Sequence, residues 1–413
     1  MDLFLSPLEA VFFGPPRSNV AGETHEVRSL FPPPISAFQG MVRSRLLAGA
    51  SPALDLSDRS RQARQRVAEL VGEPGALPEG WQLTGPFPAE LKHETTERRR
   101  PYLEPWLPCP EFLRRPEPNV GEPVRWEPLE PAEDQSWMGF GAEQATAVKD
   151  EPFHLFTTWS RQQEPSLGGW LRADNLLWAL SGKGTWAREG HGRVPPFVKW
   201  EEHTGLAIDP EKGVAMDGML YCRHYLRWAF GSGLYGTLTA PSLPSALDLA
   251  ALGSGTIAMG RGGRLGAFEP VPRMSDAWNQ LRSGAHLPEE LPEHSRCWLV
   301  LLTPARVPRE CQLDLRGSWG VAIDEPKVEL RVLRAGLARP EVLGGFSLAR
   351  GASSANQTYL GAGSCWLVEL TGGTPQQRAD VLKRLNGRCV LGANSERPFG
   401  HGFCLVGTSS PLR

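Results

Sequence analysis

The sequence predicts an α+β protein made of two units, each with its strands and helices in the order βαββαβ. Three observations support this prediction. Strand-like and helix-like segments alternate along the chain, and 413 residues exceed what a single core usually organises. The chain also contains 38 Pro and 45 Gly, which favours many loops and few long helices. We therefore expect long loop-rich insertions between the regular elements.

The first unit begins with a strand over residues 3–13, which ends at a Gly-Pro-Pro turn. Three prolines then precede a helix that we expect to start near Ile35 or Ser36 and to continue to Leu47. Its apolar residues share one face at 3.6 residues per turn, and they are Ile35, Phe38, Val42 and Leu46. Another face carries Gln39 and Arg43 beside Gly40, where a ligand can approach closely.

A polar loop joins this strand to this helix, and it carries Arg17, Asn19, His25 and Arg28. A second helix is predicted over residues 58–71, with Ser57 or Asp58 as the N-cap and Gly72 as the stop signal. Its arginine-rich face suits either phosphate contact or simple solvation.

Residues 50–200 read as a long insertion within the first unit. Proline and charge dominate residues 85–131, so we predict an extended surface segment there, pinned to the body by Tyr102, Trp106 and Phe112. The acidic half of that segment suits a protein partner. A helix is predicted over 170–180, followed by a basic loop or hairpin over 183–199 that begins with Lys183.

The first unit closes with a hairpin, a helix and a strand. The hairpin is predicted over residues 203–225 with its turn at 209–213, the helix over 243–252 and the strand over 256–259. Arg261 and Arg264 then lie among glycines whose bare backbone amides suit phosphate contact. This order is that of a ferredoxin-like (RRM-like) domain, which we assign to residues 1–265.

The second unit is expected to repeat this plan over residues 266–413. Strands are predicted at 297–303, 366–370 and 403–407, and a helix at 375–385. His401 lies in a Gly-rich turn just before the last strand, where it can approach RNA.

Several function classes lack their motifs in this sequence. There is no HExxH, CxxC or GxSxG, so we expect no metal, no cofactor and no hydrolase of those kinds. The segment around Lys183 fails the P-loop pattern because Gly184 follows the lysine. Seven scattered cysteines suit free thiols, and we expect a soluble cytoplasmic protein without a membrane span. The formal charge of −2 leaves room for a local basic patch that tracks an RNA backbone.

Four separated stretches resemble one family, the third subunit of the Cmr (type III-B CRISPR) effector complexes in the RAMP superfamily. They are the N-terminal strand with the helix after FPPP, the middle hairpin HTGLAIDPEKGVAMDGMLY, the segment TIAMGRGGRLGAFEP and the late block VLGGFSLARGASSANQTYLGAGSCWLVEL. PFGHGFCLVG is similar to the family's last strand. The tag-binding subunit of type III-A complexes shares this architecture, so the subtype stays open at this stage.

The resemblance implies two ferredoxin-like domains and a non-catalytic subunit that caps the foot of the complex. It also implies that the subunit holds the 5′ tag of the CRISPR RNA, next to the large signalling subunit and a backbone RAMP subunit. From the residues, we expect the RNA surface to contain Arg17, Asn19, Arg28, Gln39, Gly40, Arg43, Lys183, Arg261, Arg264 and His401.

Two alternatives remain open from the sequence. A metal-independent endoribonuclease of the same superfamily would need a general base such as His25 or His401. A protein-only adaptor would use the Pro-rich acidic insertion.

Overall fold

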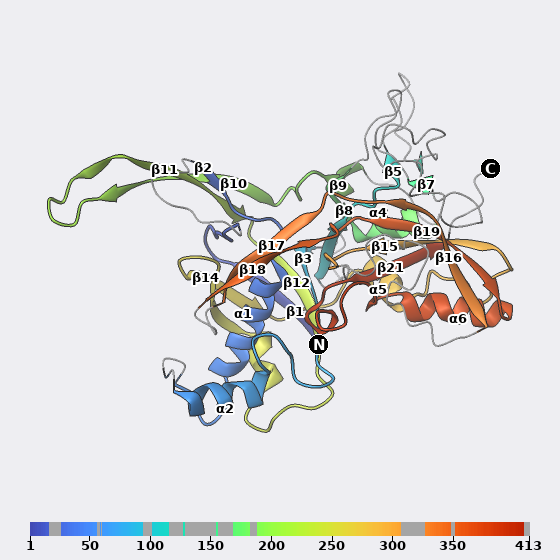
Figure 1. The fold of residues 1–413 in the computed structure, drawn as a ribbon, viewed down its shortest axis with the longest axis horizontal. Helices are drawn as coiled ribbons and strands as arrows, with labels where there is room; N and C mark the ends of the chain where they lie inside the picture. Colours follow the sequence, from blue (N-terminus) through green and yellow to red (C-terminus); the bar gives the residue numbers. More distant parts are fainter. Residues whose placement is uncertain are drawn as a thin grey trace, which may run out of the picture.

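The computed structural model describes most of the chain (Figure 1). The described residues are 1–15, 26–55, 58, 60–93, 101–114, 127–128, 154–155, 168–181, 188–306, 327–347 and 352–408. They form a mixed α+β body of two large sheets with helices packed on them, and a long two-stranded arm that projects from the body.

The first large sheet has eight strands, and each strand is antiparallel to its neighbours. In spatial order they are β13 (Gly255–Met259), β14 (Arg264–Glu269), β1 (Asp2–Pro7), β12 (Ser232–Thr239), β3 (Gln82–Lys92), β4 (Tyr102–Pro108), β8 (Trp170–Arg172) and β9 (His191–Gly192).

Strands β3 and β4 correct the prediction that residues 85–131 form an extended surface segment. Proline fixes φ near a value that extended strands tolerate, so each proline costs one donor and does not forbid the strand. Burial of Phe87, Ala89 and Leu103 offsets that cost. Trp106 and Phe112 are buried, as the proposed anchoring role requires. The acidic half of the segment lies largely outside the described residues.

Helix α1 (Ile35–Ala48) covers one face of this sheet and starts where the three prolines predicted. Its buried residues include all four of the predicted apolar face. Leu3 and Leu5 of β1 point into the same cluster as Phe38, while Phe4 between them points to the other face. A Cβ at Gly236 of β12 would lie 2.6 Å from the Phe38 ring, so this glycine lets the helix approach the strand closely.

The same face carries two smaller elements. Helix α2 (Arg61–Val71) begins three residues later than predicted, because Ser60 is the N-cap and accepts from the Ala63 N–H. Gly72 ends it, as predicted. The helix expected at 243–252 is a short 3₁₀ turn, η3 (Leu249–Gly253), capped by Asp248.

The second large sheet has six strands. In spatial order they are β20 (Arg388–Cys389), β21 (Phe403–Thr408), β15 (Ser295–Leu301), β19 (Cys365–Gly372), β16 (Val328–Gly336) and β7 (His154–Leu155). All neighbours are antiparallel except β16 and β7. The predicted strands at 297–303, 366–370 and 403–407 are thus confirmed.

The two sheets share a core that also contains helices α4 (Ala173–Ser181) and α5 (Asp276–Ser283). The fully buried Trp278 of α5 lies at its centre, with ring centroids 5.8 Å from Phe87 and 5.8 Å from Tyr235. Its Nε1 donates to the Tyr235 hydroxyl at 3.0 Å, and that hydroxyl donates to Asp2. The helix expected from Trp170 begins at Ala173, because Trp170–Arg172 pair with β4.

Helix α6 (Pro375–Leu385) covers the outer face of the second sheet and has the predicted bounds. Thr374 and Gln377 form a reciprocal capping box with Pro375 at the first helical position, which explains why the start was readable from sequence.

The arm is formed by β10 (Val198–Ile208) and β11 (Ala215–Trp228), and β2 (Glu26–Arg28) pairs parallel to β11 near its base (Figure 1). The turn lies at the predicted position, and the Asp209 carboxylate accepts from the N–H groups of Glu211 and Lys212. The hairpin was expected to form the second and third strands of the first βαββαβ unit. The structure corrects this, because β10 and β11 form a separate sheet with β2, outside the eight-stranded sheet.

Four further strands form two small antiparallel pairs: β17 (Glu341–Ser347) with β18 (Ala352–Tyr359), and β5 (Leu113–Arg114) with β6 (Glu127–Pro128). A 3₁₀ turn, η2 (Arg188–Gly190), precedes β9, and another, η5 (Arg397–Phe399), precedes β21.

Candidate nucleic-acid interface

An aromatic cluster fixes the base of the arm on the body. Phe31, the residue before the three prolines, lies 5.4 Å from Trp170 and 6.0 Å from Trp228 between ring centroids. Phe197, just before β10, lies 5.9 Å from Trp106 and 6.1 Å from Trp228. Phe31 and Phe197 therefore connect the base of the arm to the body, and Phe31 does so directly before the prolines that lead into α1.

The Gly-rich turn between β13 and β14 lies against the segment that enters the basic loop. The Arg261 N–H donates to the Phe12 carbonyl at 2.7 Å. Gly260 has φ +61°, and a Cβ there would lie 2.5 Å from the same oxygen, so the approach requires glycine. The Arg261 side chain is exposed, and its Nη1 lies 3.8 Å from a Cβ built at Gly14. Arg261 thus sits where the loop carrying Arg17 and Asn19 begins.

Arg264 lies beside the arm and is already paired. Its Nη1 donates to the Glu9 carboxylate at 2.8 Å, and its guanidinium lies 5.5 Å from the centre of the Tyr225 ring. The Leu265 N–H and the Arg264 guanidinium together lower the pKa of Glu9. Arg264 therefore connects β14 to the N-terminal segment, and its side chain is partly exposed.

Arg28 ends strand β2 and is largely exposed. Its guanidinium donates to Glu26 two residues earlier, at 3.1 and 3.2 Å. The next residue, Ser29, donates its N–H to the His224 carbonyl, which joins this strand to the arm. Arg17 and Asn19 of the preceding loop, and Lys183, lie outside the described residues.

The three residues of α1 that were predicted to face RNA differ in their exposure and in their hydrogen bonds. The Gly40 backbone is open, because apart from its chain neighbours and the helix backbone around it, no heavy atom of the described chain lies within 4 Å of a Cβ placed there. The buried Oε1 of Gln39 accepts no hydrogen bond from any described residue. Arg43 instead donates to the carbonyls of Gly72 and Glu73, so its guanidinium holds the end of α2. Burial lowers the pKa of Arg43.

Two arginines of the arm were missed in the sequence analysis. Arg223 lies over two rings, 4.7 Å from the centre of Tyr221 and 5.8 Å from that of Phe12. Arg227 pairs with Glu201 on the neighbouring strand. The signal was present, because the segment YCRHYLRW alternates aromatic and basic residues at the strand period of two.

We call Arg223, Arg227, Arg261 and Arg264 the arm-base cluster. Arg227 and Arg264 each have a carboxylate partner, whereas Arg223 and Arg261 pair with no acidic group in the described part of the chain. A polyanion can therefore pair with these two without first displacing a carboxylate.

His401 lies in the second half of the chain and has its own contacts. Its Nδ1 lies 3.0 Å from the Pro304 carbonyl, and its ring stacks on Tyr359 at 5.0 Å. Burial lowers the pKa of His401. These contacts account for its place in the fold without any ligand.

Comparison with protein families identifies the chain. The family model described as CRISPR-associated protein (Cas_Cmr3) matches residues 3–409. The chain belongs to this family. The resemblance carried by the four stretches is confirmed.

Solved structures give a weaker likeness. One chain of a cryo-EM structure of the type III-B Cmr-beta complex bound to cognate target RNA is 13% identical, with a TM-score of 0.42, over 89% of this chain and 86% of that one. A chain of the same complex bound to cognate target RNA and AMPPnP is 14% identical, with a TM-score of 0.40, over 93% and 88%. No curated protein matches the chain. None of the described helices has the length and apolarity that a membrane crossing requires.

Proposed function

We propose that this chain is a non-catalytic RNA-binding subunit of a type III-B CRISPR effector complex and that it holds the 5′ tag of the CRISPR RNA. The observation that carries the proposal is the family match over residues 3–409. The surface at the arm base supports it, because arginines and aromatic rings alternate there beside glycines with bare backbone.

The proposed RNA path starts at the arm-base cluster. Arg223 and Arg261 meet phosphates first, since neither has a competing carboxylate in the described chain. Arg28, Arg264 and the loop residues Arg17 and Asn19 extend this track. On α1, Gly40 leaves room for the strand, and Gln39, whose Oε1 is buried here, would turn outward to read a base edge or a 2′-hydroxyl. We keep Lys183 and His401 as secondary candidates.

A filter-binding salt series on the purified protein tests this surface. The double variant Arg223→Ala/Arg261→Ala should bind tag-bearing RNA about tenfold or more weakly, and the slope of log K against log salt should fall by about 1.4 for two lost phosphates. Arg388→Ala is the matched control, because Arg388 is an exposed arginine on the edge strand β20. Unchanged affinity and slope in the double variant would reject the arm-base cluster as the RNA site.

RNA with a scrambled tag separates tag recognition from backbone binding. We expect the wild type to prefer the tag-bearing RNA, and we expect Gln39→Ala to reduce that preference more than it reduces total affinity. Equal binding of both RNAs by the wild type would contradict a tag-holding role.

The strand orders of the two sheets support two ferredoxin-like units. The first sheet contains β14-β1-β12-β3 and the second contains β21-β15-β19-β16, in each case the fourth, first, third and second strand of a βαββαβ unit. Helices α1 and α6 follow the first strand of one unit and the third strand of the other. We place the division after Glu269, since β14 belongs to the first sheet as a whole.

The tip of the arm supports contact with another protein subunit. Leu206 and Leu220 face each other across the strands and are 49% and 57% exposed, and Ile208 is 60% exposed. A projecting apolar surface of this kind is typical of a protein contact, and aliphatic side chains do not stack on bases as aromatic rings do. We propose that the large signalling subunit or the adjacent backbone RAMP subunit covers it.

The alternative is a metal-independent endoribonuclease that cuts the CRISPR precursor. His25 lies outside the described residues, and His401 is held by Pro304 and Tyr359. Incubation of the pure protein with precursor RNA in EDTA should give no specific product. Specific cleavage that disappears in His25→Ala or His401→Ala would establish the enzyme instead.

A further inference from the structure

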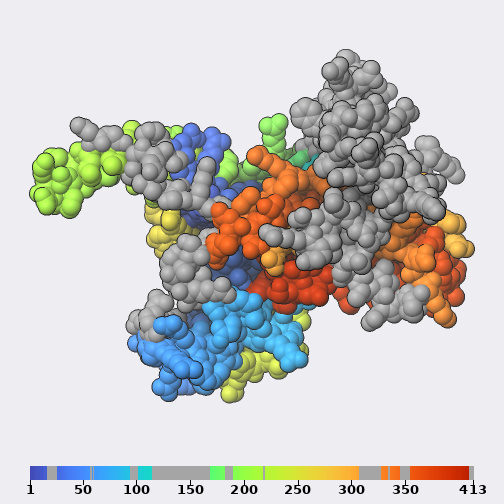
Figure 2. Space-filling view, in the orientation of Figure 1, coloured from blue at the N-terminus to red at the C-terminus, as the bar shows by residue number. Residues whose placement is uncertain are grey.

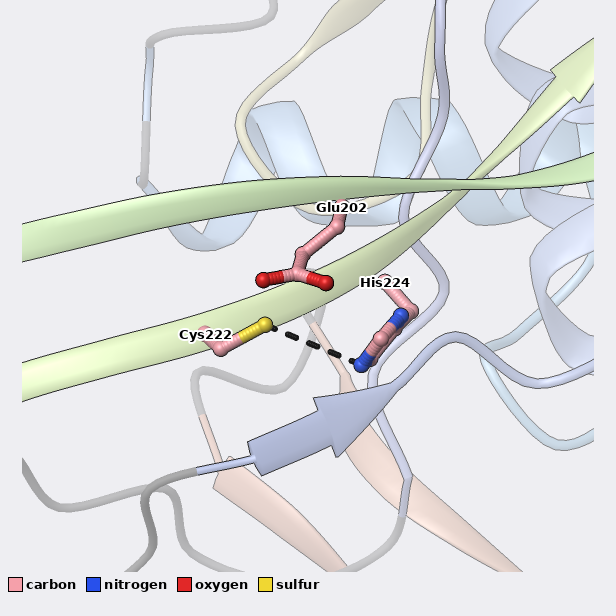
Figure 3. A group of neighbouring side chains, drawn as sticks. All are labelled: Glu202, Cys222 and His224. Atoms are coloured by element: carbon pink, nitrogen blue, oxygen red, sulfur yellow. Dashed lines mark hydrogen bonds between the residues drawn. The ribbon is translucent and has the colours of Figure 1, made fainter.

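Three potential metal ligands converge on one face of the arm (Figure 3). They are Glu202 of β10 and Cys222 and His224 of β11, and their ligand atoms all lie within 4.8 Å of one another. Cys222 Sγ lies 3.7 Å from His224 Nε2. Among the described cysteines, Cys222 is the one whose side chain is not buried.

Strand register produces this convergence. Glu202 is directly opposite His224, and Cys222 lies two residues before His224, so the strand pleat places all three on one face. The third strand adds a fourth group, because Glu26 of β2 is in register with Cys222 and its Oε1 lies 2.9 Å from His224 Nε2.

We propose that Glu202, Cys222 and His224 bind Zn²⁺, and that Glu26 becomes the fourth ligand when its carboxylate exchanges the Arg28 guanidinium for the ion. A thiolate, an imidazole and carboxylates are the ligand types that zinc takes in proteins. Metal–sulfur and metal–nitrogen bonds of about 2.3 and 2.0 Å at a tetrahedral angle put the two ligand atoms about 3.5 Å apart, close to the separation present here. On binding, the Cys222 thiol loses its proton to solvent and forms the S–Zn bond.

The site would lock β2 onto the arm. Strand β2 pairs with β11 through three residues, which is a short ladder for the strand that leaves the basic loop. Ligands from β2, β10 and β11 on one ion would join all three strands at that point. The inference stands apart from the RNA proposal, since it rests on the ligand geometry alone.

Titration of the untagged, fully reduced full-length protein tests the site. We expect one equivalent of Co²⁺ to bind with a sulfur-to-metal charge-transfer band, and Zn²⁺ to displace it. Cys222→Ser and His224→Gln should each remove the band and weaken Zn²⁺ binding by at least about 10- to 100-fold. Glu26→Gln should weaken it less, because water can take the fourth position.

His203→Gln is the matched control. His203 is a neighbouring histidine on the opposite face of the arm, bound to Glu201, so its variant should bind zinc like the wild type. Circular dichroism in EDTA checks that each variant is folded. A missing charge-transfer band, or zinc affinity unchanged in Cys222→Ser, would overturn the proposal.

Hydrogen exchange gives a readout independent of metal affinity. Zinc should slow exchange of the Ser29 N–H, which is bonded to the His224 carbonyl, and should not do so in Cys222→Ser. Equal exchange at Ser29 with and without zinc in the wild type would show that zinc does not stabilise the pairing of β2 with the arm.

Discussion

The strands of the body and those of the arm are paired equally regularly but are covered very differently. In β12 of the body, neighbouring residues such as Leu234 and Tyr235 are both fully buried, because helices or a second sheet cover each face. In β10 of the arm, burial alternates along the strand, and Leu206 and Ile208 are exposed. The outer part of the arm projects away from the body in the space-filling view (Figure 2). The body is therefore specified by packing, and the arm by cross-strand pairs and its turn, which leaves the side chains of the arm available to partners.

Polar groups are buried in networks in the body and exposed in pairs on the arm. In the body, Tyr235 joins Trp278, Asp2 and Arg282 in one network, and burial raises the pKa of its hydroxyl. On the arm, Arg227 and Glu201 form an exposed pair, of a kind that typically contributes less than about 1 kcal/mol. A substitution in the body should therefore change stability, and one on the arm should change binding.

Trp278→Ala should have the largest effect, a loss of about 3–5 kcal/mol of unfolding free energy in urea titration. The variant leaves a cavity between the sheets and removes the hydrogen bond to Tyr235. Trp200→Ala is the control from the arm, since Trp200 is 41% exposed, and its cost should be within about 0.5 kcal/mol. Similar losses in the two variants would break the contrast between body and arm.

Glu104 makes the stability of the body depend on pH. Its Oε1 accepts from the Ala173 N–H and the Ser275 hydroxyl, and burial, with the nearby Asp174, raises its pKa to about 8. Between its ordinary pKa of 4.5 and 8 the unfolded chain releases the proton first, so the unfolding free energy should fall as pH rises through this window.

Glu104→Gln removes this titration and keeps the acceptor. The variant should match the wild type near pH 4.5 and exceed it by up to about 4 kcal/mol near pH 8, as measured by urea unfolding at both values. Glu211→Gln, at the exposed turn of the arm, is the control and should show no such difference. A constant gap between Glu104→Gln and wild type across pH would contradict the assignment.

Arg43 and Arg261 sharpen the comparison because both were predicted to meet phosphate. Arg43→Ala removes the donors to Gly72 and Glu73 and should cost about 1–2 kcal/mol in unfolding free energy. Arg261→Ala should leave stability unchanged and weaken RNA binding. If Arg43→Ala weakens RNA binding as much as Arg261→Ala with no loss of stability, Arg43 belongs to the RNA surface after all.

Elements with strong local signals were readable from the sequence, and contacts between distant segments were not. Three prolines placed the start of α1 close to Ile35, and α6 has its predicted bounds, with a start that the capping box at Thr374 explains. Strands β3 and β4 were missed because their prolines suggested an irregular surface segment. Their residues become buried only through pairing with neighbouring strands, including β12, which lies far away in the sequence.

The same distinction between local signals and distant contacts applies to the residues of the candidate site. Arg261 was found from its Gly-rich turn, whereas the role of Arg43 depends on carbonyls about thirty residues away. The group Glu202, Cys222 and His224 matches no linear metal motif, since the register of the arm brings it together. Pairing partners and register are set by the whole fold, so these features needed the structure.

Gly40→Ala separates folding from binding on the open face of α1. Alanine should stabilise the helix by up to about 1 kcal/mol, because no described atom would clash with the new methyl group. If RNA passes there, the same variant should bind tag-bearing RNA more weakly. Higher melting temperature with unchanged RNA affinity would remove Gly40 from the proposed path, and Ser36→Ala, an exposed position one turn earlier, controls for a general effect of helix stability.

Leu206→Ser/Leu220→Ser should change stability least, by no more than about 0.5 kcal/mol, since both side chains are already in contact with water. The reason to make the variant is the surface that it removes. Co-expression with the other effector subunits should recover less partner protein with this variant, while the purified subunit should keep its affinity for tag-bearing RNA. Phe230→Ser is the control, because Phe230 is fully exposed but lies in the turn after β11, at the end of that strand away from the tip. Normal assembly with weakened RNA binding would show instead that the tip of the arm contacts RNA, and the contrast between body and arm would then rest on RNA recognition alone.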